Sequence, residues 1–487
     1  MRQGYVVALI NLKKLAEAAH KDLTSGKLDD CYTKVLYLLD SNPDHYFYLY
    51  LLGSYYSKRG NIGASILAYE KAVSVCENFS EAINNLGGCY RKAGMYDKAM
   101  ACFEKAVEIG KSDKFKRDTK ADGSSLLADY VSNLGSIYVG MHNPEKALGY
   151  LNEAINIYNQ CGNARWNRSL ALLEMGDYEN GFIDYDFGDR MDAKKHRNYR
   201  PGQGQTPLWE GEKDKTVVVH GEQGIGDELM FATILPDLAK DCKKVIFDAH
   251  PRLYTMFRRS FAEYNIDVYG TRKDNQLVWP NKYEIDYRIP IGSIAKFYRK
   301  RLEDFPKKPY LKAKESEVAI VNEKLDLLPA KKLNIGLSWK GGTATSSKTH
   351  RILPMKHLDI LFNELDANFI SLQYHENGKH EVDRYNEQSN NNIYHWQKII
   401  DDYDLTCALL SRLDLVISVP QSIIHLAGVM GVKAYQLSPY NYIWQMGVYG
   451  KQLPWYSSIT SIWQRSPDDW EYVVLEACRL AKEEFVC

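Results

Sequence analysis

The sequence has no excess of charge of either sign, because 62 lysines and arginines balance 62 aspartates and glutamates. A formal charge of zero argues against a general nucleic-acid binder, although it leaves room for a local basic patch. The nine cysteines are scattered and form neither a CxxC pair nor a Cys/His cluster with zinc spacing. We therefore expect free thiols in a reducing compartment and no structural metal.

Long hydrophobic runs are also missing. The amino end, MRQGYVVALINLKK, has only a short apolar run before Lys13 and Lys14. Such a run is a poor signal peptide and too short to span a bilayer, so we expect a first helix and a cytoplasmic protein without a membrane span. A chain of 487 residues that is 45% hydrophobic and 25% charged is expected to fold into two or three domains.

A repeat fills the first two hundred residues. Gly53 and Gly87 lie in matching segments, LLGSYYSKRGNIGASILAYEKAV and NLGGCYRKAGMYDKAMACFEKAV, and are 34 residues apart, which is the period of tetratricopeptide repeats. A third copy contains Gly135 after a polar insertion at 110–125, and a degenerate fourth copy begins at Arg165. Such helical pairs are stable only when stacked, so the pattern predicts a curved all-α solenoid with a concave face that presents peptides or partners.

Strands alternate with helices after a linker rich in proline and glycine at 189–207. The expected strands are Thr216–Val219, Lys244–Ala249, Ile266–Tyr269, Asp286–Ile289, Leu333–Trp339, Asn368–Gln373, Leu413–Val419 and Lys433–Leu437. This alternation predicts parallel sheets. Two runs, starting near 207 and 330, predict two α/β lobes that face a cleft, with a last helix at Trp470–Phe485 packed on them.

The turn EQGIGDE, at Glu222–Glu228, is the centre of the candidate site. It follows a buried strand, and its Gly224 and Gly226 allow the backbone to approach a ligand. It lacks both GK[ST] and GxGxxG, so it is neither a Walker loop nor a dinucleotide fingerprint. We interpret Asp227 as a carboxylate that takes a proton at the mouth of a cleft, with Glu222 in the same cleft loop. A helix cap is the alternative role for Asp227.

A second segment, SVPQSIIHLAGVMG at 418–431, passes from a strand into a helix. Free backbone N–H groups near Gln421, Ser422 and Ile423 predict a phosphate site at this helix start, with His425 one turn further on. A packed or capped histidine is the alternative for His425.

A third segment, WKGGTATSSKTHRILP at 339–354, ends a strand in Gly341 and Gly342 and continues as a loop rich in hydroxyl groups. Lys340, Lys348 and Arg351 give this loop three cations, and arginine is a fork-shaped donor suited to a diphosphate. The alternative is a solvated loop, above all for Lys348.

These segments resemble bacterial tetratricopeptide proteins with a heptosyltransferase-like glycosyltransferase domain. The strings that carry the resemblance are PLWEGE…TVVVHGEQGIGDELMFA, IGLSWKGG…HRILPMKHL, FISLQ, LDLVISVPQSIIHLAGVMG and PWYSSITSIWQR. The architecture is also similar to O-linked N-acetylglucosamine transferase. The resemblance implies a solenoid over 1–195 followed by a GT-B fold, with an acceptor-side Rossmann-like lobe at 196–328 and a nucleotide-sugar lobe at 329–487. It implies no cofactor and no required metal, because the nucleotide sugar is a substrate.

The resemblance also assigns roles to residues. It makes Asp227 the catalytic base and places Arg351, three residues before Pro354, on the donor diphosphate. The motif usually read Val-Asp-Thr-x-x-Ala-His-Leu is matched from Val419 to Leu426, but Pro420 replaces the Asp and Gln421 the Thr. The expected donor-binding residues are Arg351, Gln421, Ser422, Ile423, His425, Trp339, Gly341 and Gln373.

The resemblance thus implies an inverting, metal-independent glycosyltransferase. It would move a sugar from a nucleoside-diphosphate sugar to a hydroxyl of a protein, glycan or other acceptor that the repeats recruit. One alternative is a degenerate transferase that serves as a tetratricopeptide adaptor, which Pro420 favours. Another is a modified nucleic acid as acceptor, which a basic stripe leading into the cleft would favour. The sequence assigns neither the donor nor an oligomeric state.

Overall fold

The computed structural model describes residues 2–112, 115, 123–190, 199–200, 204–274, 276–341, 351–374, 377–440 and 453–485. Gly342 and Lys348 lie outside the described residues, as do most of the expected insertion at 110–125 and most of the linker at 189–207. The chain divides into two compact units, Met1–Ala171 and Leu172–Cys487, which are described separately. Among the described residues, no helix is both long and apolar enough to cross a bilayer.

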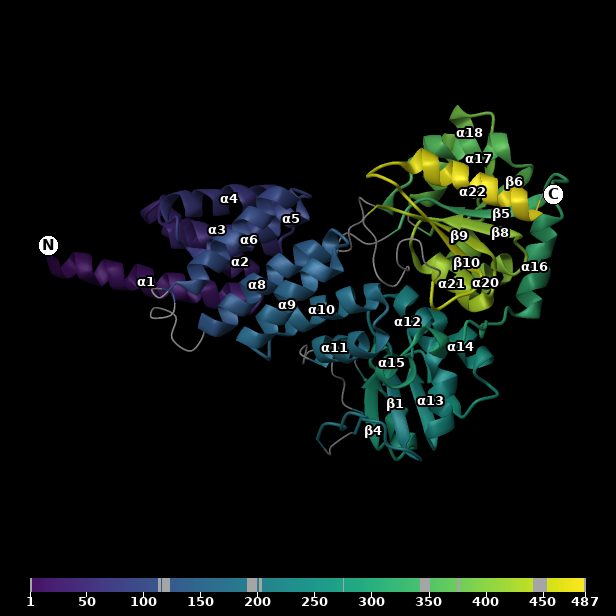
Figure 1. Cartoon of the computed structure of the whole chain (residues 1–487), viewed down its shortest axis with the longest axis horizontal. Helices are drawn as coiled ribbons and strands as arrows, with labels where there is room; N and C mark the ends of the chain where they lie inside the picture. The colour runs from purple at the N-terminus through teal and green to yellow at the C-terminus, as the bar shows by residue number, and fades with distance from the viewer. Residues whose placement is uncertain are drawn as a thin grey trace. The chain divides into compact units, whose positions relative to one another are not determined.

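The first unit is built from helices that pack in successive pairs, coloured purple to blue in Figure 1. They are α1 (Arg2–Thr24), α2 (Leu28–Ser41), α3 (Tyr46–Lys58), α4 (Ile62–Val75), α5 (Ser80–Lys92), α6 (Tyr96–Lys111), α8 (Gly123–Gly140), α9 (Pro144–Ile157) and the first part of α10 (Gly162–Met175). A Cβ at Gly53 would lie 2.7 Å from the Tyr69 ring, and one at Gly87 would lie 2.8 Å from the Phe103 ring. The repeated glycines therefore allow the two helices of a pair to approach closely, as the repeat predicts.

The second unit contains two parallel sheets. The four-stranded sheet has the order β3-β2-β1-β4 and the six-stranded sheet the order β10-β9-β8-β5-β6-β7. The strands are β1 (Thr216–His220), β2 (Lys244–Asp248), β3 (Ile266–Tyr269), β4 (Tyr287–Pro290), β5 (Leu333–Ser338), β6 (Ala367–Ser371), β7 (Ile393–Tyr394), β8 (Leu415–Ser418), β9 (Ala434–Ser438) and β10 (Ile459–Trp463). All eight predicted strands and their parallel pairing are confirmed, whereas β7 and β10 were not predicted.

Helices and short 3-10 turns connect these strands. The α-helices are α11 (Tyr178–Arg190), α12 (Ile225–Phe231), α13 (Leu235–Asp241), α14 (Tyr254–Ser260), α15 (Ala295–Tyr298), α16 (Glu315–Leu325), α17 (Leu358–Glu364), α18 (Gly378–Gln388), α19 (Gln397–Asp401), α20 (Tyr403–Leu410), α21 (Ser422–Met430) and α22 (Trp470–Phe485). The 3-10 turns are η3 (Ala232–Ile234), η4 (Pro251–Leu253), η5 (Pro280–Lys282), η6 (Gly292–Ile294), η7 (Leu302–Asp304) and η9 (Met355–His357). The expected last helix is confirmed as α22.

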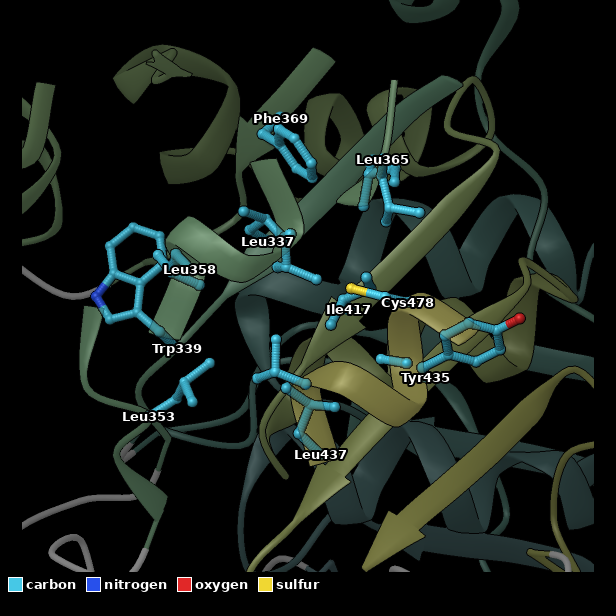
Figure 2. Close-up of a cluster of buried hydrophobic side chains, with 14 of the residues drawn as sticks. Leu337, Trp339, Leu353, Leu358, Leu365, Phe369, Ile417, Tyr435, Leu437 and Cys478 are labelled. Atoms are coloured by element: carbon cyan, nitrogen blue, oxygen red, sulfur yellow. The ribbon is translucent and has the colours of Figure 1, made fainter. Parts of the chain in front are cut away.

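The core of the six-stranded sheet joins strand side chains to α17 and α22. Figure 2 shows Leu337, Phe369 and Leu437 from three strands beside Leu358 of α17 and Cys478 of α22. Every one of these side chains is almost or fully buried. This packing fixes the carboxyl ends of β5 and β8, where the candidate site lies.

Helix α11, the last helix of the degenerate fourth repeat, belongs to the second unit. Its Tyr185 ring lies 5.7 Å from the Phe231 ring of α12, and its Asp186 pairs with Lys296 of α15 at 2.7 Å. The division between the units falls inside α10, after Ala171. The physical reason is that α11 buries its aromatic face against the four-stranded sheet region.

Candidate functional site

The turn after β1 holds Asp227 at the start of α12. All five residues of β1 are buried, and a Cβ at Gly221 would overlap the side chain of Glu228, so the turn needs glycine there. One carboxylate oxygen of Asp227, Oδ2, accepts the N–H of Gly224 at 3.0 Å, while the residue remains partly exposed. Asp227 is therefore the third residue of α12 and not its N-cap, which is Gly224, and its hydrogen bond to the N-cap backbone fixes the position of the carboxylate.

The start of α21 meets this turn from the six-stranded sheet. A Cβ at Gly226 would lie 2.8 Å from Cδ2 of His425 and 3.5 Å from Cα of Ser422. Only a glycine at position 226 allows the backbones of α12 and α21 to approach each other this closely. The structure therefore brings together two motifs that are about two hundred residues apart in the chain.

His425 packs at this junction as a neutral ring. It is 2% exposed, and its Nδ1 lies 2.9 Å from the hydroxyl of Tyr456. Burial lowers the pKa of His425 to about 4. Burial raises the pKa of Tyr456 well above its usual value, and the negative charge of Asp227 raises it further, so the phenol is close to this carboxylate. This geometry agrees with the alternative interpretation of His425 as a packed histidine.

Arg351 supplies a cation whose charge interacts with that of Asp227. Burial lowers the pKa of its guanidinium, and the charges of Tyr374 and Asp227 oppose that shift. Arg252, from η4 after β2, stacks on the Tyr403 ring at 4.6 Å. Burial raises the pKa of Tyr374, and the charges of Arg351 and Arg252 both lower it.

A short ladder closes the base of the 339–354 segment. The N–H of Gly341 donates to the carbonyl of Arg351 at 3.0 Å, and the N–H of Leu353 donates to the carbonyl of Trp339 at 2.8 Å. A Cβ at Gly341 would overlap the carbonyl oxygen of Pro420. Arg351 is therefore held next to the start of α21 by backbone contacts.

Three of the predicted donor-binding side chains point into the protein. The Trp339 indole is fully buried in the core of Figure 2 and donates to Glu381 at 2.9 Å. The Gln373 amide oxygen accepts the N–H groups of Trp339 and Lys340 at 3.1 and 2.9 Å. Gln421 is buried and donates to the hydroxyls of Ser338 and Ser418. In this arrangement these side chains shape the loops, and a ligand would meet the backbone at these positions.

The remaining predicted residues support the junction. Ser422 is partly exposed at the first turn of α21, with its hydroxyl 3.4 Å from that of Tyr403, whereas Ile423 is 5% exposed. Glu222 is buried, and its Oε1 accepts the N–H of Gly292 at 2.7 Å. Glu222 therefore ties the glycine turn to the end of β4.

Sequence reasoning missed a buried ion pair behind the turn. Glu228 is fully buried; it accepts the N–H of His250 at 2.7 Å and pairs with Arg272 at 2.7 Å. A second nitrogen of Arg272 donates to the carbonyl of Gln223 at 2.6 Å, and Gln223 has a positive φ of 54°. Burial raises the pKa of Glu228 to about 7, against the charge of Arg272.

Arg252 was also missed, although a signal for it exists. It follows β2 within four residues, at the edge where parallel strands end and where ligands bind in open α/β sheets. For Glu228 and Arg272 no comparable signal exists, because their pairing joins residues 44 apart.

The junction can hold an anion and accept a proton. Two arginines and the start of α21 supply positive charge and N–H groups, and Asp227 supplies a carboxylate beside them. Within the described ranges, no group of three or more His, Cys, Asp or Glu side chains is placed to bind a metal ion.

Comparisons with known proteins support the helical repeats. Residues 48–79 and 79–160 match models of the tetratricopeptide repeat, so the first unit contains tetratricopeptide repeats. The chain is similar to protein FlbA of Caulobacter vibrioides, at 23% identity over 85% of this chain and 80% of that protein.

The matches to solved structures have low TM-scores. PilF of Pseudomonas aeruginosa shares 15% identity at a TM-score of 0.33, with 47% of this chain and 85% of that chain covered. MamA shares 20% identity at a TM-score of 0.29, with 36% and 95% covered.

Proposed function

We propose that the second unit is an inverting glycosyltransferase of GT-B type that uses a nucleoside-diphosphate sugar. One observation carries the proposal: Asp227, Arg351 and the start of α21 come from three separate segments and meet at one place. The resemblance to heptosyltransferase-like enzymes implies a transferase role for each of these segments. The packing of Gly226 on His425 is the physical link between them.

In the proposed reaction the donor diphosphate lies against the backbone at the start of α21 and the guanidinium of Arg351. Asp227 takes the proton from an acceptor hydroxyl as that oxygen bonds to the anomeric carbon. The bond from that carbon to the diphosphate oxygen breaks, and the nucleoside diphosphate leaves with the electron pair. The transition state has oxocarbenium character. Cations and N–H dipoles stabilise the charge that develops on the leaving group.

Arg252 adds a second positive charge on the side of the four-stranded sheet. Because Arg252 stacks on the ring of Tyr403, whose hydroxyl lies 3.4 Å from that of Ser422 at the start of α21, a diphosphate at this helix start would be neutralised from both sheets. We therefore include Arg252 among the donor-binding residues of the proposed site.

The test is donor hydrolysis by the full-length protein. Purified protein is incubated with a panel of nucleotide sugars, and release of nucleoside diphosphate is followed by mass spectrometry. We expect release from one donor class, with Asp227→Asn reducing it at least a hundredfold while nucleotide binding persists. Asp326→Asn, an exposed aspartate at the end of α16, is the matched control and should leave turnover unchanged. Full turnover by Asp227→Asn would overturn the assignment of the base.

The adaptor alternative has one observation in its favour. Pro420 stands where the related motif has an acid, and the neighbouring Gln421 side chain is buried against Ser338 and Ser418. The side chains at these two positions therefore do not replace the carboxylate of the related motif. If no nucleotide sugar of the panel binds in calorimetry, the adaptor function replaces the transferase.

A further inference from the structure

Helix α11, which ends the degenerate fourth repeat, reaches the glycine turn that precedes Asp227. The side-chain amide of Gln223 in this turn donates to the hydroxyl of Tyr185 on α11. Tyr185 is fully buried, its ring lies 5.7 Å from that of Phe231, and a Cβ at Gly292 would lie 2.7 Å from the ring. The ring is therefore fixed by its packing, and its hydroxyl is a fixed partner for the turn.

The backbone of Gln223 explains why the turn needs such a partner. Its φ of 54° lies in the left-handed region, which residues other than glycine rarely adopt. A residue stays in this region only where its surroundings hold it there. Gln223 is exposed, so burial does not hold it. Instead, Arg272 donates to its carbonyl at 2.6 Å, and the hydroxyl of Tyr185 accepts from its amide.

The conformation of Gln223 sets the direction of the Asp227 carboxylate. The next residue, Gly224, donates its N–H to Oδ2 of Asp227 at 3.0 Å. This N–H belongs to the same planar peptide group as the carbonyl that Arg272 holds. A rotation at Gln223 would therefore turn the N–H away from the carboxylate. Tyr185 thus acts on Asp227 through the side chain of Gln223 and one peptide plane.

We propose that Tyr185 is a positioning residue of the candidate site, and that the site needs α11 to hold Asp227 in its working geometry. The inference deepens the proposed function and rests on it, because Asp227 is a base only in that reaction. Tyr185 acts through Gln223, whereas the proposed donor contacts lie elsewhere, at Arg351 and the start of α21. Loss of the hydroxyl should therefore lower kcat and leave KM for the donor unchanged.

Hydrogen exchange of the full-length protein, followed by mass spectrometry without a donor, tests the positioning directly. The variant Tyr185→Phe keeps the ring and its packing but removes the hydroxyl. We expect peptides that cover residues 221–228 to exchange at least about tenfold faster than in the wild type, because the N–H groups of Gly224 and Glu228 lose their acceptors more often. Peptides of the six-stranded sheet should exchange as in the wild type.

Donor hydrolysis measures the consequence for turnover. Tyr185→Phe should lower kcat by about ten- to hundredfold, with KM for the donor unchanged within about twofold. Tyr435→Phe is the matched control, because Tyr435 is a buried tyrosine of β9 whose hydroxyl donates to Glu484 at 2.9 Å. This control should change neither the exchange of the turn nor kcat.

Gln223→Ala removes the same interaction from its other side. Since Gln223 is exposed, this replacement leaves the core intact. If Tyr185 acts through Gln223, each single variant should lower kcat by a similar factor, and the double variant should be no slower than the slower single variant. A role of Tyr185 in packing alone predicts that the two effects multiply.

Three results would overturn the inference. They are unchanged exchange of residues 221–228 in Tyr185→Phe, unchanged kcat of that variant when the wild type is active, and multiplied effects of Tyr185→Phe and Gln223→Ala. Failure of the proposed function looks different. The wild type would then hydrolyse no donor, while hydrogen exchange would still report whether Tyr185 holds the turn.

Discussion

Replacing Arg272 by methionine removes the cation that faces the buried carboxylate of Glu228. The two side chains lie 2.7 Å apart, and Glu228 is fully buried. The same guanidinium also donates to the carbonyl of Gln223 in the turn before Asp227. Arg272→Met should therefore destabilise the second unit and loosen the turn that positions the proposed base.

The size of the effect depends on pH, because the pKa of Glu228 is raised to about 7 by burial. Since the folded state holds this proton more tightly than the unfolded state, the wild-type contribution of Glu228 to stability falls as pH rises from about 4.5 to 7. Removing Arg272 raises the folded pKa further. The penalty of Arg272→Met is then about 1–2 kcal/mol at pH 6, from the lost hydrogen bonds. It should grow by about 1.4 kcal/mol per pH unit above 7.

Urea unfolding followed by tryptophan fluorescence measures this penalty. Eight of the nine tryptophans lie in the second unit, with Trp166 the exception, so the signal reports that unit. The measurement is made at pH 6 and pH 8.5 for Arg272→Met and for its double variant with Glu228→Gln. Arg258→Met, an exposed arginine of α14, is the control and should shift stability by less than about 0.5 kcal/mol.

The double variant tests whether the penalty of Arg272→Met acts through the charge of Glu228. Glu228→Gln removes the ionisable group but keeps the side-chain shape, so the penalty should no longer grow above pH 7. If Arg272→Met costs the same at pH 6 and pH 8.5, or if the double variant keeps the pH dependence, the pair does not act through the charge of Glu228.

Other predictions follow from close contacts and from burial. Gly226→Ala should abolish donor hydrolysis and lower stability by about 1–3 kcal/mol, because its Cβ would lie 2.8 Å from His425; unchanged turnover would contradict the packing. His425→Gln should flatten the loss of stability on acidification. The folded pKa of His425 is about 4 against 6.5, so its stability is present above pH 6.5 and falls by up to about 3 kcal/mol at pH 4, as urea midpoints would show. Gly87→Ala should lower the melting temperature of the helical signal in circular dichroism, because its Cβ would lie 2.8 Å from the Phe103 ring; an unchanged melting curve would refute the repeat packing.

The sequence contained enough information to predict the strands that are buried and regular. β1 and β8 are short apolar runs followed by glycine or proline, and both lie where they were expected. β7 has two residues and β10 carries partly exposed positions, so neither produced a continuous apolar run. A strand could therefore be predicted where its sequence is a continuous apolar run, whatever its place in the sheet.

The candidate site was predictable where a local pattern marked it. Asp227 follows a glycine turn, and Arg351 follows a loop of hydroxyl residues, so both stood out. The directions of Trp339 and Gln421 depend on partners about 40 and 80 residues away, and no local pattern encodes them. Arg272 could not be predicted for the same reason, because its role depends on tertiary contacts with Glu228 and Gln223.

The ladder between 339–341 and 351–353 has a consequence for how this protein could diversify. Because the two ends are joined by their own backbone hydrogen bonds and anchored at Gly341 against Pro420, their positions do not depend on the side chains between them. Residues 342–350 could therefore be exchanged or lengthened while Arg351 stays in place. Under the proposed transferase function, exchange of this segment would change the donor preference while the frame stays unchanged.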